Sequence, residues 1–291
     1  MTKKVLIVGH GFVGQAVESV LRTEKIQISI IDPKYKTKVD DYLDTNPIYI
    51  FICVPTPSKD DGSQDNKILK KVINECADNF PSSILVIKST VLPSFINEVP
   101  NVIDKIILNP EFLTERNAKN DLINASFQIF GGDEATCKDF EKFLRKNTIC
   151  KFTRSHFVSI EVASLIKYAV NSFLALKVIF FNQFKDIFKN LNLSENEYLQ
   201  FIEGVAMDER VGSSHMKVPG PDGRKGFGGA CFPKDTNALL NFYKMHDINF
   251  SLLSEVISVN NILRKDYNSL LKRELDQNIN FDNQTEDNNG D

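Results

Sequence analysis

Short apolar runs rich in β-branched residues recur along the first half of the chain, and segments with polar or helical patterns separate them. Six runs are typical of buried strands: residues 4–8, 28–32, 48–54, 84–87, 105–108 and 127–130. Repeated alternation of this kind indicates an α/β fold with a doubly wound parallel sheet of the Rossmann type. We therefore predict a nucleotide-binding first domain over residues 1–155.

The pattern changes after residue 155. Apolar residues at helical spacing run from Val158 to Asn190 and again from Ser251 to Leu275, without proline or glycine. These two long helices predict a mainly helical central domain over residues 156–275. Residues 276–291 are polar and acidic, and this composition predicts a disordered tail.

The helix predicted over residues 251–275 is rich in apolar positions. They are Leu252, Leu253, Val256, Ile257, Val259, Ile262 and Leu263. This is more apolar surface than an isolated helix of a monomer needs, so we expect the helical domain to support a homodimer. Packing against the 158–190 helix would use the same face, and a role in the core stays open.

Composition limits the function classes. The chain has 291 residues, 42% of them hydrophobic and 25% charged, with a formal net charge of −3. This balance predicts a globular protein without a basic face for nucleic acid. The five cysteines are odd in number and show no CxxC spacing, so we expect no metal site and no disulfide framework. A cytoplasmic location fits these cysteines, and we expect no membrane span.

The first predicted strand runs directly into Gly9-His10-Gly11-Phe12-Val13-Gly14, a helix follows, and the next strand ends at Asp32. Strand, GxGxxG, helix, strand and acid in this order form the dinucleotide-binding fingerprint. We expect the glycine loop to bind the pyrophosphate at the helix N-terminus and Asp32 to bind the adenosine ribose. The acid favours NAD over NADP, although Lys34 and Lys36 leave NADP open. The cofactor-binding residues predicted here are Gly9, Gly11, Phe12, Val13, Gly14, Asp32 and Lys34.

A second glycine-rich segment, GFGGACFPKD, spans residues 226–235. Its glycines leave room for another molecule to approach the backbone, and Pro233 suits the first turn of a helix. Cys231 would then lie just before a helix N-terminus, where the dipole and Lys234 favour the thiolate. We predict a nucleophilic cysteine, with a buried structural cysteine as the alternative.

Further segments accompany these two. They are Val54-Pro55-Thr56-Pro57 with Asp61-Gly62 downstream, Lys88-Ser89-Thr90-Val91, Asn109-Pro110-Glu111-Phe112-Leu113-Thr114-Glu115, the stretch from Glu161 to Asn171 with Lys167-Tyr168, and Arg210-Val211-Gly212. Their types and order resemble the UDP-glucose/GDP-mannose dehydrogenase family. Members of that family usually continue into a third domain that holds part of the sugar nucleotide, and we expect this chain to lack it.

The resemblance implies a four-electron oxidation of UDP-glucose to UDP-glucuronate, with NAD as the acceptor twice. Cys231 would carry a thiohemiacetal and then a thioester. Lys167 and Asn171 lie four residues apart on one helical face, where they could stabilise an oxyanion. Asp235 would lie one helical turn from Cys231 and could order a water. The family suggests that Glu111 activates the water that attacks the thioester and that Thr90 positions it.

The resemblance also implies contacts for both ligands. Expected near the cofactor are Val54, Pro55, Thr56, Thr90, Glu115 and Lys234. Expected near the nucleotide sugar are Glu111, Phe112, Leu113, Glu115, Lys167, Asn171, Arg210, Phe227, Gly228 and Cys231. Arg210 could act in the neighbouring subunit. We expect His10 and His215 to serve packing rather than chemistry, and the loop over residues 213–223 to replace contacts of the third domain.

Three alternatives remain at this stage. The same chemistry could act on another nucleotide sugar, such as GDP-mannose or a UDP-N-acetylhexosamine. The chain could be a truncated, non-catalytic nucleotide-binding subunit, although every predicted catalytic residue is present. A β-hydroxyacid dehydrogenase has a similar domain order, but its chemistry has no use for Cys231.

Overall fold

The structure is a computed structural model that describes residues 2–114, 116–267 and 269–281. It divides into two compact units. The first contains the chain up to Thr56 together with Asp65–Lys167, and the second contains Pro57–Gln64 and the chain from Tyr168 onward. The division therefore lies later than the predicted boundary at residue 155. A seventh strand and the first turns of a long helix belong to the first unit, which explains the difference.

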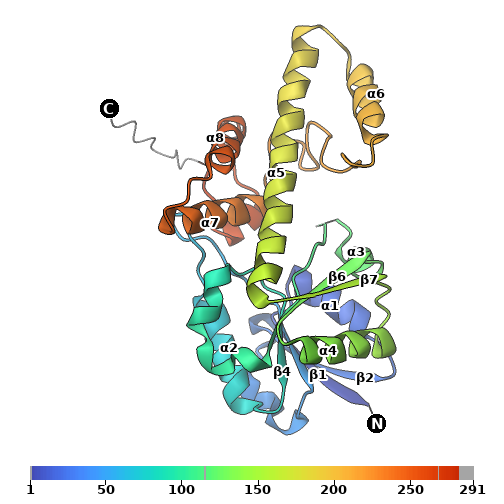
Figure 1. Ribbon diagram of the computed structural model, residues 1–291, viewed down its shortest axis with the longest axis vertical. Coiled ribbons are helices and arrows are strands. Elements are labelled where there is room, and N and C mark those ends of the chain that lie inside the picture. Colours follow the sequence, from blue (N-terminus) through green and yellow to red (C-terminus); the bar gives the residue numbers. More distant parts are fainter. Residues whose placement is uncertain (1, 115, 268, 282–291) are drawn as a thin grey trace. The chain divides into compact units, whose positions relative to one another are not determined.

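The first unit is built on one sheet (Figure 1). Its strands are β1 (Lys3–Val8), β2 (Ile26–Ile31), β3 (Tyr49–Ile52), β4 (Ile84–Ile87), β5 (Ile106–Leu108), β6 (Phe127–Gly131) and β7 (Arg154–Val158). Its α-helices are α1 (Phe12–Leu21), α2 (Lys67–Asn79), α3 (Ala118–Ile123) and α4 (Glu134–Asn147). All six predicted strands are present. β7 escaped prediction because its residues are half-buried or exposed and form no apolar run.

The strand order is β2-β1-β3-β4-β5-β6-β7. The sequence predicts a parallel sheet. The observed sheet is not wholly parallel, because β6 runs antiparallel to β5 through the pair Leu108 and Gly131. β6 and β7 are parallel to each other. Strand direction depends on how the connecting segment returns to the sheet, and the composition of a strand does not reveal it.

Alternate residues of the strands point to opposite faces of the sheet, so each face has its own apolar core. On one face, Leu6, Ile50 and Leu85 pack with residues of α2. On the other face, Ile7, Phe51 and Val86 pack with residues of α1, α3 and α4. Figure 1 shows these two helical layers on the sheet. The α/β prediction is confirmed for this unit.

The second unit is helical. Its helices are α5 (Ile160–Asn190), which begins in the first unit, α6 (Glu195–Ala206), α7 (Phe232–Met245), α8 (Ser251–Lys265) and α9 (Lys272–Asp276). The helix predicted over residues 251–275 is interrupted after Lys265. Arg264 and Glu274 form an ion pair at 2.7 Å. Residues ten apart in one continuous helix would be separated by roughly 15 Å along its axis, so this pair requires the break.

The start of the predicted tail also differs from the structure. Asp276 ends α9, and the side chains of Ile279 and Phe281 are buried. These two apolar residues attach residues 276–281 to the second unit, despite the polar composition around them. The remainder of the predicted tail, residues 282–291, lies outside the described residues.

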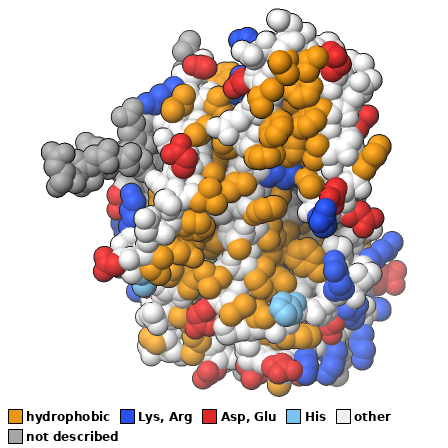
Figure 2. Space-filling view, turned by 45° about the horizontal axis from the view of Figure 1, so that its top comes forward, with side chains coloured by type: hydrophobic (Ala, Val, Ile, Leu, Met, Phe, Trp, Pro, Cys, Tyr) orange, Lys and Arg blue, Asp and Glu red, His pale blue; other side chains and the backbone are white. Residues whose placement is uncertain are grey.

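Helix α5 is unusually long and apolar. By length and composition alone it could cross a membrane, contrary to the sequence-based expectation, but half of its most apolar stretch is buried inside the protein. The core helix of a water-soluble protein passes the same test. Phe173, Phe180 and Ile187 on this helix are exposed. Figure 2 shows hydrophobic side chains gathered at the surface in the upper part of that view.

Candidate active site

The glycine loop follows β1, and the neighbouring strand β3 ends beside it. β1 pairs with β2 on one side and with β3 on the other. Helix α1 covers one face of the sheet and α2 the other. The carboxyl ends of β1 and β3 are therefore the topological switch point of the sheet, where open α/β sheets bind ligands.

Two glycines of the loop fit a bound pyrophosphate for different reasons. A Cβ atom at Gly11, the N-cap residue of α1, would have no neighbour within 4 Å, so the space before the helix N-terminus is open. A Cβ atom at Gly14 would lie 2.1 Å from the Gly9 carbonyl oxygen, so only glycine allows α1 to pack against the turn. The open space and the amides of the helix N-terminus suit an anion.

Asp32 and its surroundings are fixed by hydrogen bonds. Its carboxylate accepts hydrogen bonds from the backbone amides of His10 at 2.6 Å and Lys34 at 2.9 Å. The Lys34 ammonium donates to the His10 carbonyl at 2.6 Å. His10 is buried, and its ring contacts Glu18 and Tyr35 at 2.9 Å each. These contacts hold the His10 ring inside the first unit.

The loops after β3 and β4 are joined to each other. The Thr56 hydroxyl donates to the Thr90 carbonyl at 3.0 Å, and the Ser89 hydroxyl donates to the Val54 carbonyl at 2.6 Å. Pro55 is exposed. The VPTP and KST segments are thus bonded to each other at the carboxyl edge of the sheet, although they are separate motifs in the sequence.

Glu111 and Lys167 form a buried ion pair in the first unit. The Lys167 ammonium lies 3.1 Å from one Glu111 carboxylate oxygen and donates to the Glu111 carbonyl at 2.5 Å. The other carboxylate oxygen accepts from the Leu113 amide at 2.7 Å. Lys167 also lies over the ring of Phe112 at 5.3 Å. The structure thus brings together four residues that the sequence assigned to substrate.

Sequence reasoning missed Lys88 as a buried charge. Its ammonium donates to the Asn109 side chain at 2.8 Å, and Asn109 in turn donates to Gln128 at 3.0 Å. Burial lowers the pKa of Lys88 to about 8. Lys88 and Asn109 open two of the family-like motifs, so the signal was present, but nothing in the sequence indicated that they form one network.

Four of the five cysteines are poor nucleophiles at neutral pH. Burial raises the pKa of Cys53 and of Cys76 to about 12 and that of Cys137 to about 11, and it also raises the pKa of Cys150. Cys231 is partly exposed at the N-cap of α7. Its position before a helix N-terminus agrees with the sequence prediction and favours a thiolate.

Asp235 lies one turn into α7 and is almost fully buried. Its carboxylate accepts hydrogen bonds from the Asn171 side-chain amide at 2.6 Å and from the Lys234 ammonium at 2.5 Å. Lys234, which we expected near the cofactor, is thus engaged with Asp235. In the second unit, the bond between Asn171 and Asp235 joins α5 to α7, and the Asp235 amide donates to the Cys231 carbonyl at 2.8 Å.

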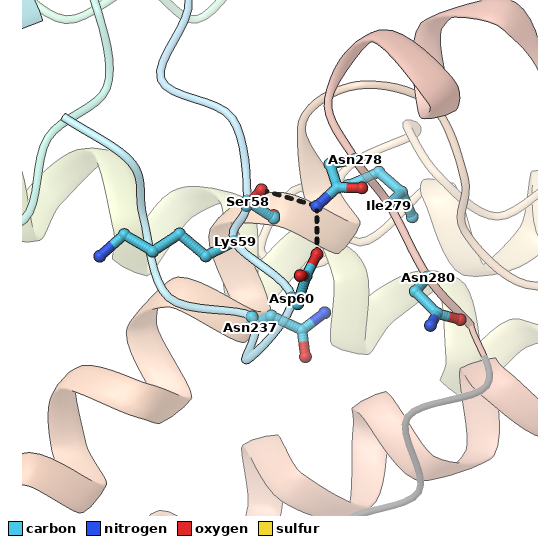
Figure 3. A pocket seen from close by; sticks show the side chains of 8 residues that line it. Ser58, Lys59, Asp60, Asn237, Asn278, Ile279 and Asn280 are labelled. Atoms are coloured by element: carbon cyan, nitrogen blue, oxygen red, sulfur yellow. Dashed lines mark hydrogen bonds between the residues drawn. The ribbon is translucent and has the colours of Figure 1, made fainter. Parts of the chain in front are cut away.

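The segment Pro57–Gln64 belongs to the second unit, although it follows β3. Asn278 donates hydrogen bonds to the Ser58 carbonyl and to the Asp60 carboxylate, each at 3.1 Å (Figure 3). Together with Asn237 of α7, these residues line a polar pocket of about 250 Å³. Residues near the end of the described chain therefore contact the segment that follows the VPTP motif, which the sequence did not suggest.

The remaining predicted residues have varied surroundings. Arg210 is exposed and forms an ion pair with Asp208 at 2.6 Å. The Phe227 ring is buried in the apolar core of the second unit, so only its backbone could meet a substrate. His215 is half-buried, and its ring lies 5.5 Å from Phe232. Glu115 lies outside the described residues.

The loop over residues 213–223 packs against the second unit. Met216 and Val218 are buried with Phe181 and Ile202. The ammonium of Lys177, a residue that the sequence analysis did not select, donates to the carbonyls of Val211 and Gly212. This loop and the Arg210 segment before it are therefore attached to α5 and α6.

Comparison with known proteins agrees with these motifs. Residues 34–148 match the NAD binding domain of the UDP-glucose/GDP-mannose dehydrogenase family, and residues 161–262 match the central domain of the same family. A UDP-glucose 6-dehydrogenase of Rickettsia felis is 31% identical over 285 residues, which cover 86% of this chain and 60% of the relative. UDP-glucose 6-dehydrogenase YwqF of Bacillus subtilis is 32% identical over 223 residues, which cover 73% of this chain and 48% of the relative.

Solved structures share the fold. A UDP-glucose dehydrogenase from Pyrobaculum islandicum superposes with a TM-score of 0.74 at 23% identity, covering 91% of this chain and 69% of that one. A 3-hydroxyisobutyrate dehydrogenase of Mycobacterium tuberculosis gives 0.67 at 16% identity and covers 97% of both chains. The second likeness shows that the layout of the fold does not distinguish these two kinds of dehydrogenase, so the motifs must do so.

The chain spans about 60% of the length of the Rickettsia felis relative. Over that length the two matched domains of one family follow each other in order, and together they include the VPTP, KST and NPEFLTE segments and the cysteine loop. This chain belongs to the UDP-glucose/GDP-mannose dehydrogenase family.

Proposed function

We propose that the protein oxidises UDP-glucose to UDP-glucuronate with two equivalents of NAD, and that Cys231 is the nucleophile. The observation that carries this proposal is the cluster at α7: a partly exposed thiol at the helix N-cap, with a buried carboxylate one turn later that Asn171 holds. A simple alcohol dehydrogenase needs no such thiol.

The proposed reaction balances as follows. The primary alcohol loses a hydride and a proton and becomes an aldehyde. The Cys231 sulfur adds to the aldehyde carbon to give a thiohemiacetal, which loses a second hydride and a proton to become a thioester. Water cleaves the thioester, releasing the carboxylate, a proton and the free thiol. NAD supplies the acceptor for both hydrides when it is bound.

The residues of the second unit suit the steps at sulfur. The N-terminus of α7 stabilises a thiolate at Cys231. Asn171 presents an amide and Asp235 a carboxylate to the same region, so an oxygen that gains negative charge has a donor and its proton an acceptor. Losing one donor of this kind commonly raises a barrier by roughly 3–4 kcal/mol.

The residues of the first unit suit cofactor binding and hydrolysis. Gly11 and Gly14 leave the open N-terminus of α1 for the pyrophosphate, and Asp32 lies after β2, as ribose binding requires. Glu111, held by Lys167, is the proposed base for the water that attacks the thioester. The Lys167 ammonium lies 3.1 Å from one carboxylate oxygen of Glu111 and so fixes the direction of that side chain.

The test is the number of NADH molecules formed per sugar consumed. We expect two NADH and one UDP-glucuronate per UDP-glucose, and no acid from Cys231→Ala. The matched control is Cys150→Ala, which removes a half-buried thiol of the first unit and should keep the stoichiometry. One NADH per sugar would indicate a simple alcohol dehydrogenase. Turnover only with GDP-mannose or a UDP-N-acetylhexosamine would change the substrate, and no turnover with any of them would favour a binding subunit.

We also propose a cytoplasmic homodimer, but through α5 rather than the helix first expected. Five of the seven apolar positions predicted for dimerisation on α8 pack inside the protein: Leu253, Val256 and Ile257 are buried, and Val259 and Leu263 are partly buried against the apolar core of the second unit. On α5, Phe173, Phe180 and Ile187 are 62%, 49% and 49% exposed. They are spaced seven residues apart and so lie on one side of the helix, which suits contact with a second copy.

A further inference from the structure

The backbone of the cysteine loop is held by side chains from three helices of the second unit. The Gly226 amide donates to Asn182 of α5 at 3.0 Å, and the Phe227 amide donates to Asn260 of α8 at 2.6 Å. The Gly229 amide donates to Glu274 of α9 at 3.1 Å. Three of the amides just before Cys231 are therefore fixed by side chains that no sequence motif of the loop contains.

The last of these contacts rests on a buried ion pair. Arg264 is 2% exposed and Glu274 is fully buried, and they meet at 2.7 Å. The same Glu274 oxygen accepts from Arg264 and from the Gly229 amide, while the second oxygen accepts from the Leu271 amide at 2.7 Å. Arg264 also reaches Asp222 at 2.7 Å, in the loop that leads to Gly226.

The ion pair of Arg264 and Glu274 explains why residue 228 is a glycine. A Cβ atom at Gly228 would lie 2.2 Å from an Arg264 nitrogen and 2.4 Å from a Glu274 oxygen. The sequence suggested that the loop glycines make room for another molecule. At Gly228, the room is taken by the protein's own ion pair, which lies directly against the loop backbone.

A buried ion pair is a poor source of stability, because the cost of removing both charges from water offsets their attraction. Here one nitrogen of Arg264, Nε, is also buried and has no hydrogen-bond partner among the residues that the structure describes. What an apolar pair could not provide is an acceptor for the Gly229 amide and a donor toward Asp222. The ion pair of Arg264 and Glu274 therefore fixes the cysteine loop more than it stabilises the fold.

We propose that Glu274, with Arg264, is a positioning residue that sets the loop backbone so that Cys231 meets the N-terminus of α7 in its reactive geometry. This inference deepens the proposed function and rests on Cys231 being its nucleophile. It also gives the segment after α8 a role: α9 brings Glu274 to the loop, while Asn278 and the Gln277 carbonyl contact Ser58. One short segment thus holds both the cysteine loop and the loop after β3.

The test measures the thiol itself. The protein over residues 1–291 is treated with iodoacetamide between pH 6 and 9, and alkylation of the Cys231 peptide is followed by mass spectrometry. We expect Glu274→Gln to slow alkylation at pH 7 by roughly fivefold, because a thiol displaced from the helix N-terminus loses its stabilisation as a thiolate. In Glu274→Gln, the pH at which Cys231 alkylation is half-maximal should also rise, because the thiolate is less stable.

A second variant distinguishes a displaced loop from an unfolded protein. Arg264→Met with Glu274→Leu replaces both charges by apolar residues of similar volume, a change that usually preserves folding. It removes the acceptor for the Gly229 amide, so alkylation of Cys231 should be slowed as in Glu274→Gln. The matched control is Asp276→Asn, an exposed carboxylate on the same helix, which should react like the wild type. If the folded double variant alkylates at the wild-type rate or faster, the proposal is wrong.

The experiments distinguish a failure of the positioning role of Glu274 from a failure of the proposed oxidation. Alkylation requires neither sugar nor NAD, so it reports on the loop even if the wild type oxidises no nucleotide sugar. If the oxidation is observed, Glu274→Gln should lower kcat on the order of 10- to 100-fold, as expected for a displaced nucleophile, with KM for NAD unchanged. An unchanged kcat beside slowed alkylation would overturn the catalytic part of the proposal.

Discussion

The side-chain amide of Asn171 donates a 2.6 Å hydrogen bond to the carboxylate of Asp235. The two residues are 64 positions apart in the sequence, and the bond joins α5 to the first turn of α7. Because Asp235 also pairs with Lys234, its carboxylate has a fixed direction one turn from Cys231. The geometry around the thiol thus depends on a polar contact between two helices.

Asp235→Asn should reduce both stability and activity. The substitution leaves the buried Lys234 ammonium without a carboxylate, and breaking a buried pair commonly costs about 3–5 kcal/mol. We expect a lower urea midpoint and NADH formation slower by on the order of 100-fold. The matched control is Asp139→Asn, which breaks an exposed pair with Lys142 and should change neither quantity appreciably. Wild-type turnover by Asp235→Asn would exclude a role for this carboxylate.

Gly14→Ala should weaken NAD binding. The added Cβ atom would lie 2.1 Å from the Gly9 carbonyl oxygen, so α1 must move away from the glycine turn. A moved helix N-terminus binds the pyrophosphate less well, and we expect Kd for NAD to rise by about tenfold or more. Isothermal titration calorimetry measures this. Gly204→Ala, in α6, is the control, because a Cβ atom there has no neighbour within 4 Å. An unchanged Kd in Gly14→Ala would contradict the glycine loop as the pyrophosphate site.

The sequence predicted the first unit better than the second for a physical reason. Buried strands such as β1 and β4 are continuous apolar runs, and the residues that bind a nucleotide follow them directly. A motif that is local in sequence is also local in space, so the glycine loop and Asp32 were found. The direction of β6 depends on a connection rather than on its own residues, and it was missed.

The supports of the cysteine loop could not be predicted in the same way. Asn182, Asn260 and Glu274 each lie 33 to 45 residues from the loop amide that they bind. On its own helix, Glu274 is one more acid in a polar segment, and only the break after α8 brings it to Gly229. The positions of the proposed catalytic residues were readable as motifs, while the residues proposed to orient them were not.

Lys88 should make stability depend on pH in the alkaline range. Burial lowers its pKa to about 8 in the folded protein, from an ordinary value of 10.5. Between these two values the unfolded chain binds more protons than the folded protein, so this group makes the free energy of unfolding rise with pH. Below pH 8 the amine is charged in both states, so the stability gained from its neutral folded form is lost.

A variant isolates this contribution from other groups that titrate in the same range. Lys88→Met has no amine, so the stability of the variant relative to the wild type should fall as pH rises from 8 to 10.5. The slope should approach but not exceed about 1.4 kcal/mol per pH unit. Urea unfolding at several pH values measures it, and Lys71→Met, at an exposed position of α2, is the control. A difference that does not change with pH would show that burial does not lower the pKa of Lys88.

Phe173→Glu with Phe180→Glu should separate the proposed dimer. These side chains are 62% and 49% exposed on one side of α5, and charges placed there would face each other across a symmetric contact. We expect sedimentation velocity to change from dimer to monomer. Met245→Glu is the control, since Met245 is 71% exposed at the end of α7 and outside this face. A wild type that sediments as a monomer, or a double variant that still sediments as a dimer, would exclude this interface.

Glu111→Gln tests the hydrolytic step. Glu111 is buried and held by Lys167 at 3.1 Å, and the proposed role is to accept a proton from the water that attacks the thioester. Glutamine preserves the shape but cannot take the proton, so both hydride transfers should occur and hydrolysis should be slow. We expect a burst of two NADH per active site, followed by turnover slower by about 10²–10⁴-fold.

The burst should leave the acyl group on the enzyme. Intact-protein and peptide mass spectrometry after mixing with UDP-glucose and NAD should find a UDP-glucuronyl adduct on Cys231. Glu134→Gln removes an exposed carboxylate from α4 and should show neither a burst nor an adduct. If Glu111→Gln loses activity without forming the adduct, Glu111 acts before the thioester, and its ion pair with Lys167 then serves an earlier step of the oxidation.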